Sequence, residues 1–194
     1  MNMEKLNELR NRAYKTAREH GFHDEELSNE HLLCLVISEL MEAIEADRKG
    51  KYFPIDEIEE YNNLQKDKFC IPVFKNYIKD TVEDELADVV IRLLDLAGLR
   101  DIDLSALQEP LFDKFNINPE FISWKFQLKE MSFTERIFFL CSIFSSGEGI
   151  EDIVRSAILT IFLNADILGI DLLWHIDQKM KYNELRPAMH GKKY

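Results

Sequence analysis

The sequence predicts an all-α protein, and three observations support this prediction. Gly and Pro are scarce, with 7 and 5 residues in a chain of 194, which favours long helices over a strand-and-turn architecture. Apolar residues recur at helical spacing through most of the chain, and no stretch resembles a pair of strands. Hydrophobic residues at 46% and charged residues at 31% are typical of a soluble globular protein.

Apolar periodicity predicts seven helices along the chain. Ser28 and Thr81 are expected N-caps, because their side-chain oxygens can accept hydrogen bonds from the first free backbone N–H groups. Acids follow both residues and suit the positive end of a helix dipole. Residues 50–80, with one Gly and two Pro, read as an irregular insert with short helical pieces, either a lid or a connector. The expected helices are 3–20, 28–49, 81–99, 104–115, 132–145, 149–168 and 171–185.

The charge distribution narrows the possible partners. The formal net charge is −12, which argues against nucleic acid because phosphate binding needs a basic face. Residues 178–194 nevertheless hold five basic residues against one acid. This distribution suits a small polyanion, held between metal ions and a basic tail, better than it suits a polymer.

Membrane, secreted and zinc-binding classes are not indicated. No run approaches the roughly 18 apolar residues of a membrane span, and the N-terminus MNMEKLNELRNRAYK is too charged for a secretory signal. We therefore expect a cytoplasmic protein with no membrane partner. Cys34, Cys70 and Cys141 are odd in number and widely separated, which predicts neither disulfides nor a zinc site. We expect all three to be reduced and buried.

The chain also repeats itself. A shift of 68 positions lays residues 82–104 over residues 150–172, and the apolar positions match in type. The polar stripe does not match: Glu85, Asp88, Arg92 and Asp95 become Ile153, Ser156, Thr160 and Leu163.

This match predicts a tandem duplicated two-helix unit, packed as a pseudo-dimer in one domain over 1–194. The acidic half is 20–115 with the insert 50–80, and the degenerate half is 128–194 with the basic tail. The alternative is that amphipathic helices simply resemble one another.

Two pairs of acids form the candidate metal site. Glu39 and Glu42 are three residues apart on one expected helix, and Glu85 and Asp88 are three apart on another. Each pair spans about 4.5 Å along its helix and lies in one angular sector. Helices packed at about 8–10 Å would bring the four carboxylates into one cleft. Their repulsion requires a cation, and oxygen ligands without His or Cys favour Mg²⁺ or Mn²⁺.

Other interpretations of these acids are open. Glu85 and Asp88, with Arg92 and Asp95, could be the solvated side of an ordinary amphipathic helix. Glu39 and Glu42 fit that interpretation less well, because their helix is apolar almost all round. A ferritin-like di-metal site would need Glu-x-x-His pairs, and none occurs. Glu83, Asp84 and Glu45 are interpreted as solvated or capping charges, although Glu45 could also reach the site.

The stretches SELMEAIEA and EDELADVVIRLL resemble the Glu-x-x-Glu and Glu-x-x-Asp signature of the all-α NTP pyrophosphohydrolase superfamily, the MazG-like and dimeric dUTPase-like proteins. The ending KMKYNELRPAMHGKKY is similar to the nucleotide-contacting C-terminal stretch of that group. The resemblance covers roughly 20–49, 80–104 and the tail. The second half lacks the acids, which is closer to the dimeric dUTPase style.

The resemblance implies a Mg²⁺-dependent hydrolase that cleaves nucleoside triphosphates between the α- and β-phosphates, in nucleotide-pool house-cleaning. Glu39, Glu42, Glu85 and Asp88 would hold the metal, and Glu39 would accept the proton of the attacking water. Lys179, Asn183 and Arg186 lie at i, i+4 and i+7 and would contact phosphate or sugar, unless they only form a solvated helix end.

The same resemblance assigns weaker roles to other residues. Tyr182 would stack a base or simply pack, and His190, Lys192 and Lys193 would close over the phosphates. His31 and Trp174 are interpreted as structural. A homodimer or larger homo-oligomer is expected, with the site completed either within one chain or across subunits. The alternatives are a non-catalytic helical binding module and a phosphoribosyl-ATP pyrophosphohydrolase.

Overall fold

The computed structural model describes residues 6–66, 68–108, 111 and 119–187, and all regular structure in these residues is helical. The all-α prediction is therefore confirmed. The helices, together with one short 3₁₀ segment (η1), are α1 (Leu6–Glu19), α2 (Asn29–Arg48), η1 (Ile55–Glu57), α3 (Ile58–Leu64), α4 (Ile71–Tyr77), α5 (Val82–Leu99), α6 (Ser105–Gln108), α7 (Pro119–Lys129), α8 (Phe133–Ile143), α9 (Ile150–Leu168) and α10 (Leu172–Glu184).

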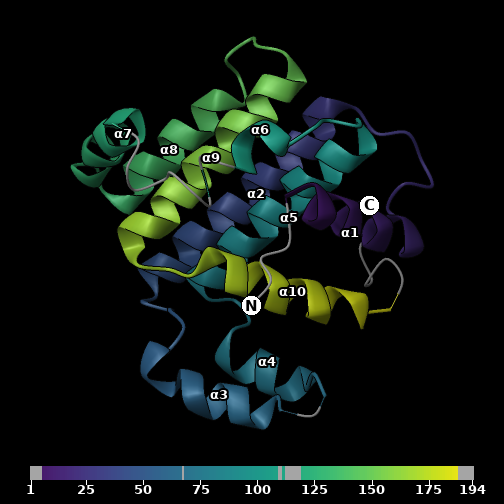
Figure 1. The fold of residues 1–194 in the computed structure, drawn as a ribbon, viewed down its shortest axis with the longest axis vertical. Helices are drawn as coiled ribbons and strands as arrows, with labels where there is room; N and C mark the ends of the chain where they lie inside the picture. Colours follow the sequence, from purple (N-terminus) through teal and green to yellow (C-terminus); the bar gives the residue numbers. More distant parts are fainter. Residues whose placement is uncertain (1–5, 67, 109–110, 112–118, 188–194) are drawn as a thin grey trace.

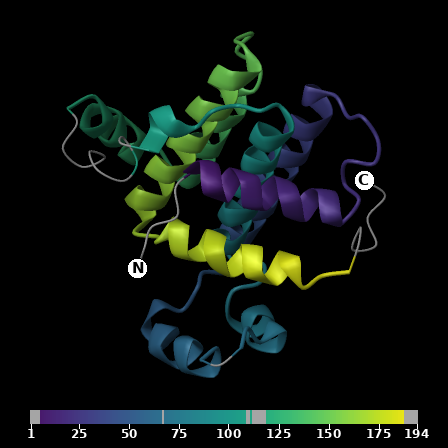
Figure 2. The same ribbon diagram turned by 45° about the vertical axis from the view of Figure 1, so that its right-hand side comes forward.

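Helix α5 is the centre of the bundle. It packs along α2, while α1 and α10 lie side by side across it and α9 contacts it as well (Figures 1 and 2). Because neighbours surround it, its side chains are buried on nearly every side, including Leu86, Val90 and Leu93, which have no exposed surface. The N-caps of α2 and α5 are Ser28 and Thr81, as predicted.

The second half of the chain forms its own helix pair against this centre. Helix α8 begins with a capping box, in which Ser132 and Glu135 each accept from the other's backbone N–H. It packs on α9 and α2, and α7 also packs on α9. None of the described helices is long and apolar enough to cross a membrane alone; α9 and α10 reach that composition only together, and they are bent by 113°.

The insert 50–80 folds into two short helices that dock beneath α10 (Figure 1). An aromatic layer holds it there, in which Phe74 stacks on Tyr182 with ring centroids 4.5 Å apart and Phe53 packs on Trp174. The Tyr61 hydroxyl donates a buried hydrogen bond to Gln178 at 3.0 Å. The insert therefore adds a second small core to the protein, and Trp174 and Tyr182 pack as structural residues within it.

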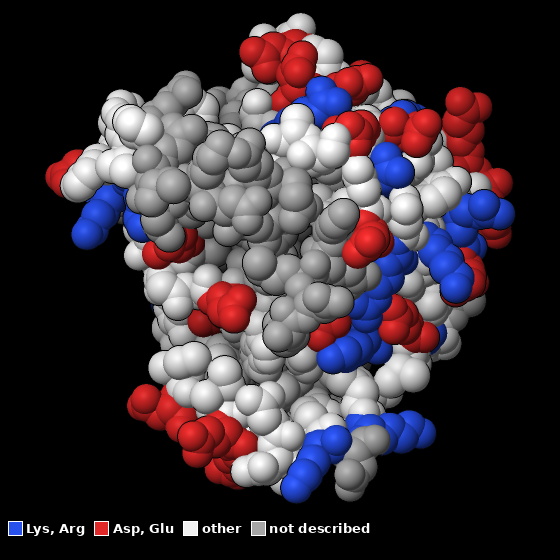
Figure 3. Space-filling view, viewed as in Figure 1, with Lys and Arg blue, Asp and Glu red and all other residues white. Residues whose placement is uncertain are grey.

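Charged side chains of both signs are spread over the surface of the protein. Figure 3 shows acidic and basic side chains interspersed on one face, with acidic side chains gathered over α3 at the lower left. Glu59 and Glu60 lie in the first turn of α3. On the face drawn, no broad basic surface of the kind that nucleic acid requires is formed by the described residues.

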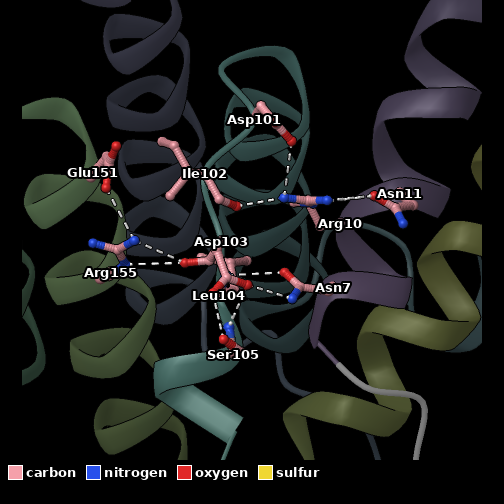
Figure 4. Close-up of polar contacts among 10 residues, drawn as sticks. All are labelled: Asn7, Arg10, Asn11, Asp101, Ile102, Asp103, Leu104, Ser105, Glu151 and Arg155. Atoms are coloured by element: carbon pink, nitrogen blue, oxygen red, sulfur yellow. Dashed lines mark hydrogen bonds and ion pairs between the residues drawn. The ribbon is translucent and has the colours of Figure 1, made fainter.

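A polar network fixes the turn after α5 to both α1 and α9 (Figure 4). The Asn7 side chain donates to Asp103 at 2.7 Å and accepts from the Leu104 backbone N–H at 3.0 Å. Arg10 donates to the Ile102 carbonyl, and Arg155 of α9 donates twice to the Asp103 carbonyl. Hydrogen bonds from Ser105 and Asn7 lower the pKa of Asp103 to about 2.

Three predictions need correction or restriction. In the stretch expected as helix 104–115, the described α-helix is only Ser105–Gln108, and 109–110 and 112–115 lie outside the described residues. Helix α7 was not predicted. The cysteines are free, but Cys34 is exposed and the other two are half-buried. Cys34 lies on the same side of α2 as the exposed Ser38 and Met41.

Candidate metal and nucleotide site

The first turn of α5 buries three consecutive acids. Glu83, Asp84 and Glu85 are only 6%, 1% and 5% exposed, so the interpretation of the first two as solvated charges is wrong. The reason is the insert and α10, which cover this helix end. Glu83 accepts from the Phe53 backbone N–H at 2.9 Å, and Asp84 accepts from the Asp80 backbone N–H at 3.0 Å.

Three of the four predicted metal ligands lie together. Carboxylate oxygens of Glu39, Glu85 and Asp88 are all within 4.8 Å of one another. Asp80, Asp84 and Glu85 form a second such group, which shares Glu85 with the first. Helix packing explains the first group, because α2 and α5 present Glu39 and the Glu85–Asp88 turn to the same seam. The interpretation of Glu85 as a solvated residue is therefore wrong.

Glu42 does not belong to either group. Its side chain is exposed at the rim of the seam, although its charge still raises the pKa of Glu39 and of Glu85. Glu45 pairs with Arg48 and Lys49 on the surface and does not reach the site.

Two cations enter the acidic site. Lys179 of α10 places its ammonium 2.7 Å from both Asp84 and Asp88, and it is itself 4% exposed. Arg92, one turn after Asp88, donates to Glu39 with Nε at 2.7 Å. Lys179 is predicted to contact substrate phosphate, but its ammonium pairs with two of the protein's own acids. In this arrangement it orders the carboxylates.

The carboxylates outnumber the cations, and their pKa values reflect this. Burial, together with the nearby Asp88, raises the pKa of Glu85 to about 8. Burial raises the pKa of Asp84 to about 6, against the lowering effect of Lys179. Burial and Asp88 also raise the pKa of Glu39, although Arg92 opposes them. Burial alone would lower the pKa of Lys179, but Asp88 and Asp84 outweigh it and raise that pKa.

A cleft opens next to the acids, between α1, α2, α5 and the end of α10. Its volume is about 920 Å³ when the open space at its mouth is included. Glu39, Asp88 and Arg92 line one end, and His23 and Asp95 line the cleft further along α5. The walls are mostly apolar, from Ala13, Ala17, Phe22, Leu27, Leu32, Leu35, Ile91 and Met180.

The end of α10 brings the two remaining predicted substrate contacts to this cleft. Asn183 and Arg186 both line it, and the side-chain oxygen of Asn183 is buried with no hydrogen-bond partner among the described residues. Helix α1 fixes this segment, since Arg12 pairs with Asp177 and Glu184 at 3.0 and 2.7 Å. The Arg186 backbone carbonyl also lies 2.8 Å from the His20 ring nitrogen Nε2.

The structure thus brings most of the predicted site together within one chain. Glu39, Glu85, Asp88 and Lys179 are in contact, and Asn183 and Arg186 face the adjoining cleft. His190, Lys192 and Lys193 lie outside the described residues.

The sequence analysis did not identify Asp84 or Arg92 as parts of the site. It also did not predict that His23 and Asp95 form a pair. One signal in the sequence could have indicated Asp84. Three consecutive acids precede LAD, which is more negative charge than the interaction with a helix dipole requires.

The donor set fits a divalent cation such as Mg²⁺. Its ligands would be carboxylate oxygens only, which Mg²⁺ and Mn²⁺ prefer. Burial and the nearby Asp88 raise the pKa of Glu85, so a bound cation would favour its ionised form. A cation would have to share the site with the Lys179 ammonium.

Comparisons with family models, with curated proteins and with solved structures found no match to this chain.

Proposed function

We propose that this protein is a Mg²⁺-dependent nucleoside triphosphate pyrophosphohydrolase that converts (d)NTPs to (d)NMPs and pyrophosphate, with a cytoplasmic house-cleaning role. One observation carries the proposal. Buried acids in excess of their cations lie at the end of a cleft that Arg186 and Asn183 also line. An acid cluster short of positive charge, next to a guanidinium, suits a ligand that is itself a metal-bound polyphosphate.

Each residue then has a role that follows from its contacts. Glu39, Glu85 and Asp88 hold the cation, and Glu42 contributes charge from the rim. When bound, Mg²⁺ neutralises phosphate charge and activates water. Glu39 is the proposed proton acceptor, because a carboxylate whose pKa is raised by burial is a better base near neutral pH. Lys179 holds Asp84 and Asp88 in place.

Substrate binding is assigned to the end of α10. Arg186 supplies a guanidinium for phosphate, and the unpaired oxygen of Asn183 is free to accept from a sugar hydroxyl. The pairing of α10 with α1 supports this, because it positions both residues before substrate arrives. A homodimer or larger homo-oligomer is part of the proposal, although the site residues named here all come from one chain.

The test is pyrophosphate release from a panel of NTPs, dNTPs and phosphoribosyl-ATP, with and without Mg²⁺. We expect metal-dependent release, reduced by about 10²–10⁴-fold in Glu39→Gln, the scale of a lost general base, and strongly reduced in Asp88→Asn. The matched control is Glu45→Gln, because Glu45 lies on the same helix but pairs with surface cations. Selective cleavage of phosphoribosyl-ATP would move the protein to that branch of the superfamily.

A second candidate is a non-catalytic helical binding module, and the positions of Lys179 and Arg92 favour it. Each cation lies where it can replace part of a metal ion's charge. Such a protein would release no pyrophosphate from any nucleotide with Mg²⁺ or Mn²⁺, and Mg²⁺ would leave its thermal stability unchanged. Either activity or a Mg²⁺-dependent rise in Tm of wild type that Asp88→Asn loses would exclude it.

A further inference from the structure

We propose that the His23–Asp95 pair reads the base of the nucleotide and selects bases that carry an exocyclic amino group. This inference rests on the proposed function, because it takes the acidic end of the cleft as the phosphate end. It assigns a specificity role to two residues outside the acid signature.

The cleft is long enough for a nucleotide to lie along it. Asp88 and Asp95 are seven residues apart on α5, which is about 10 Å along a helix and similar to the length of a nucleoside. Both residues line the cleft, as does Ile91 between them. A nucleotide with its phosphates at Asp88 would therefore place its base against Ile91 and the apolar residues of α1 and α2, with its edge near Asp95.

The pair is held firmly in the protein. The His23 ring nitrogen Nε2 lies 2.7 Å from Asp95 Oδ1, and the two side chains are 8% and 18% exposed. The ring of Tyr14 packs against the His23 ring, with centroids 5.3 Å apart. Such burial limits the rotamers of both side chains, and fixed polar groups are what discrimination between similar ligands requires.

Asp95 has acceptor capacity left over. His23 occupies Oδ1, while Oδ2 has no hydrogen-bond partner among the described residues. Burial raises the pKa of Asp95, while the bond to His23 and the charges of His23 and Arg92 oppose this and favour its ionised form. In its ionised form the carboxylate only accepts hydrogen bonds, so the ligand atom that meets that form has to be a donor.

Donor chemistry separates the bases. Cytosine and adenine present an amino group, which can donate to Asp95 and is remote from any carbonyl that would repel the carboxylate. Uracil and thymine present a ring N–H between two carbonyl oxygens, and each of these would oppose the carboxylate charge. Sites that hydrogen-bond one substrate group reject analogues lacking it far more strongly than apolar pockets do.

The alternative is that the His23–Asp95 pair has only a structural role. In that case, His23–Asp95 would only tie the segment before α2 to the end of α5, and its removal would change all nucleotides alike. Base-dependent effects therefore distinguish the two roles.

The experiment compares kcat/KM for dCTP and dUTP, in wild type and in Asp95→Asn. We expect wild type to favour dCTP by about tenfold or more, the size of one hydrogen bond to a charged group. In Asp95→Asn the amide can donate to the uracil carbonyl, so the ratio should fall to about one or below. The control is Asp166→Asn, which breaks the ion pair with Lys125 on the α7 side of α9 and should leave the ratio unchanged.

Three outcomes would overturn the inference: wild type that prefers dUTP, a variant whose loss is equal for both nucleotides, or a control that shifts the ratio equally. If Asp95→Asn does not fold, the wild-type preference alone still decides. If no nucleotide is hydrolysed, the proposed function fails, and calorimetric binding of dCMP and dUMP to wild type tests the base preference separately. Equal affinity there would reject the base-reading role.

Discussion

Helices α5 and α9 occupy matching positions in the two halves of the chain, yet only α5 buries charge. Their N-caps, Thr81 and Gly149, are 68 residues apart. Both helices end in a residue with positive φ, Asp101 at 52° and Gly169 at 74°. The following backbone N–H bonds five residues back in both, at 2.8 Å after α5 and 2.9 Å after α9. A common origin of the two helices stays a prediction, but their local geometry is the same.

The same residue types are buried in one helix and exposed in the other. Glu83 and Asp84 are buried in the first turn of α5, whereas Glu151 and Asp152 are exposed in the first turn of α9. Further along, Glu85 is replaced by the buried Ile153. Since α9 folds with Ile153 and Ser156 at the positions of Glu85 and Asp88, these two charges of α5 are not needed to build such a helix. We therefore assign Glu85 and Asp88 to the proposed site and not to the fold.

The largest expected difference between α5 and α9 is in the loss of stability when the cation that pairs with the acids of each helix is removed. We expect Lys179→Met to destabilise the protein by roughly 3–5 kcal/mol, because Asp84 and Asp88 lose their partner in a buried site. Arg155→Met, which breaks the exposed pairs of α9 with Glu151 and Asp152, should cost less than about 1.5 kcal/mol, including its hydrogen bonds to Asp103. Urea unfolding measures both.

Added Mg²⁺ should restore part of the stability of Lys179→Met, since a cation can replace the lost ammonium. It should leave Arg155→Met unchanged. Equal costs for the two substitutions would show that the acids of α5 are solvated in solution.

Glu85 should make the stability of the metal-free protein depend on pH. Its pKa is about 8 when folded, against an ordinary value near 4.5 when unfolded. Between these values the unfolded chain releases a proton that the folded chain keeps, so the stability from this group is complete below about pH 4.5 and is lost as pH rises through 8. Glu85→Gln should remove this decline, worth on the order of 3 kcal/mol.

Urea unfolding from pH 5 to pH 9, with and without Mg²⁺, checks this. Wild type should gain more from Mg²⁺ as pH rises, because the metal binds the ionised carboxylates, and Glu85→Gln should gain little at any pH. A wild-type curve that rises steadily over this range would contradict the expectation. Ile153→Val provides a matched change at the equivalent position of α9. It keeps Glu85, so its stability should follow the wild-type pH dependence, with a difference from wild type that is the same at every pH.

The sequence predicted most of the helices and one buried acid. Periodicity located α1, α2, α5, α8, α9 and α10, and the caps Ser28 and Thr81 followed from local chemistry. Glu39, out of place in an apolar helix, correctly indicated a buried acid. These are local properties, because a cap or a period depends on residues within a few turns.

The remaining features depend on contacts between distant residues. Asp84 is buried because Lys179, 95 residues later, covers it, and no property of the first turn of α5 indicates that contact. Arg92 pairs with Glu39 across the α2–α5 seam, at a sequence separation of 53. The spacing and odd number of the cysteines predicted that Cys34 is reduced and buried, but it lies on an exposed face of α2. Periodicity identifies an apolar face, but it does not identify which element covers it.

Helix α9 buries a polar residue at a position where α5 has an apolar one. Asn164 is 1% exposed, its side-chain oxygen has no partner among the described residues, and its α5 counterpart is the buried Leu96. We expect Asn164→Leu to stabilise the protein by about 1 kcal/mol, because an unpaired buried acceptor is removed. A rise in Tm of roughly 2–4 °C would measure this. Leu96→Asn is the reciprocal change and should destabilise by more, so a loss of stability in both would indicate tight packing around Asn164.

The helix ends provide the smallest and most local comparison. Asp101 and Gly169 both adopt the left-handed conformation after their helices, in which a side chain costs up to about 1 kcal/mol relative to Gly. Asp101→Gly should therefore stabilise the protein by about 0.5 kcal/mol, since Asp101 is exposed and its pair with Arg10 is long at 3.7 Å. Gly169→Ala should destabilise by about 1 kcal/mol. Thermal unfolding of the two variants measures opposite shifts in Tm if the turns are equivalent. If Asp101→Gly is instead destabilising, Asp101 contributes to the network that holds α1 to this turn (Figure 4), and the two helix ends differ in function as well as in sequence.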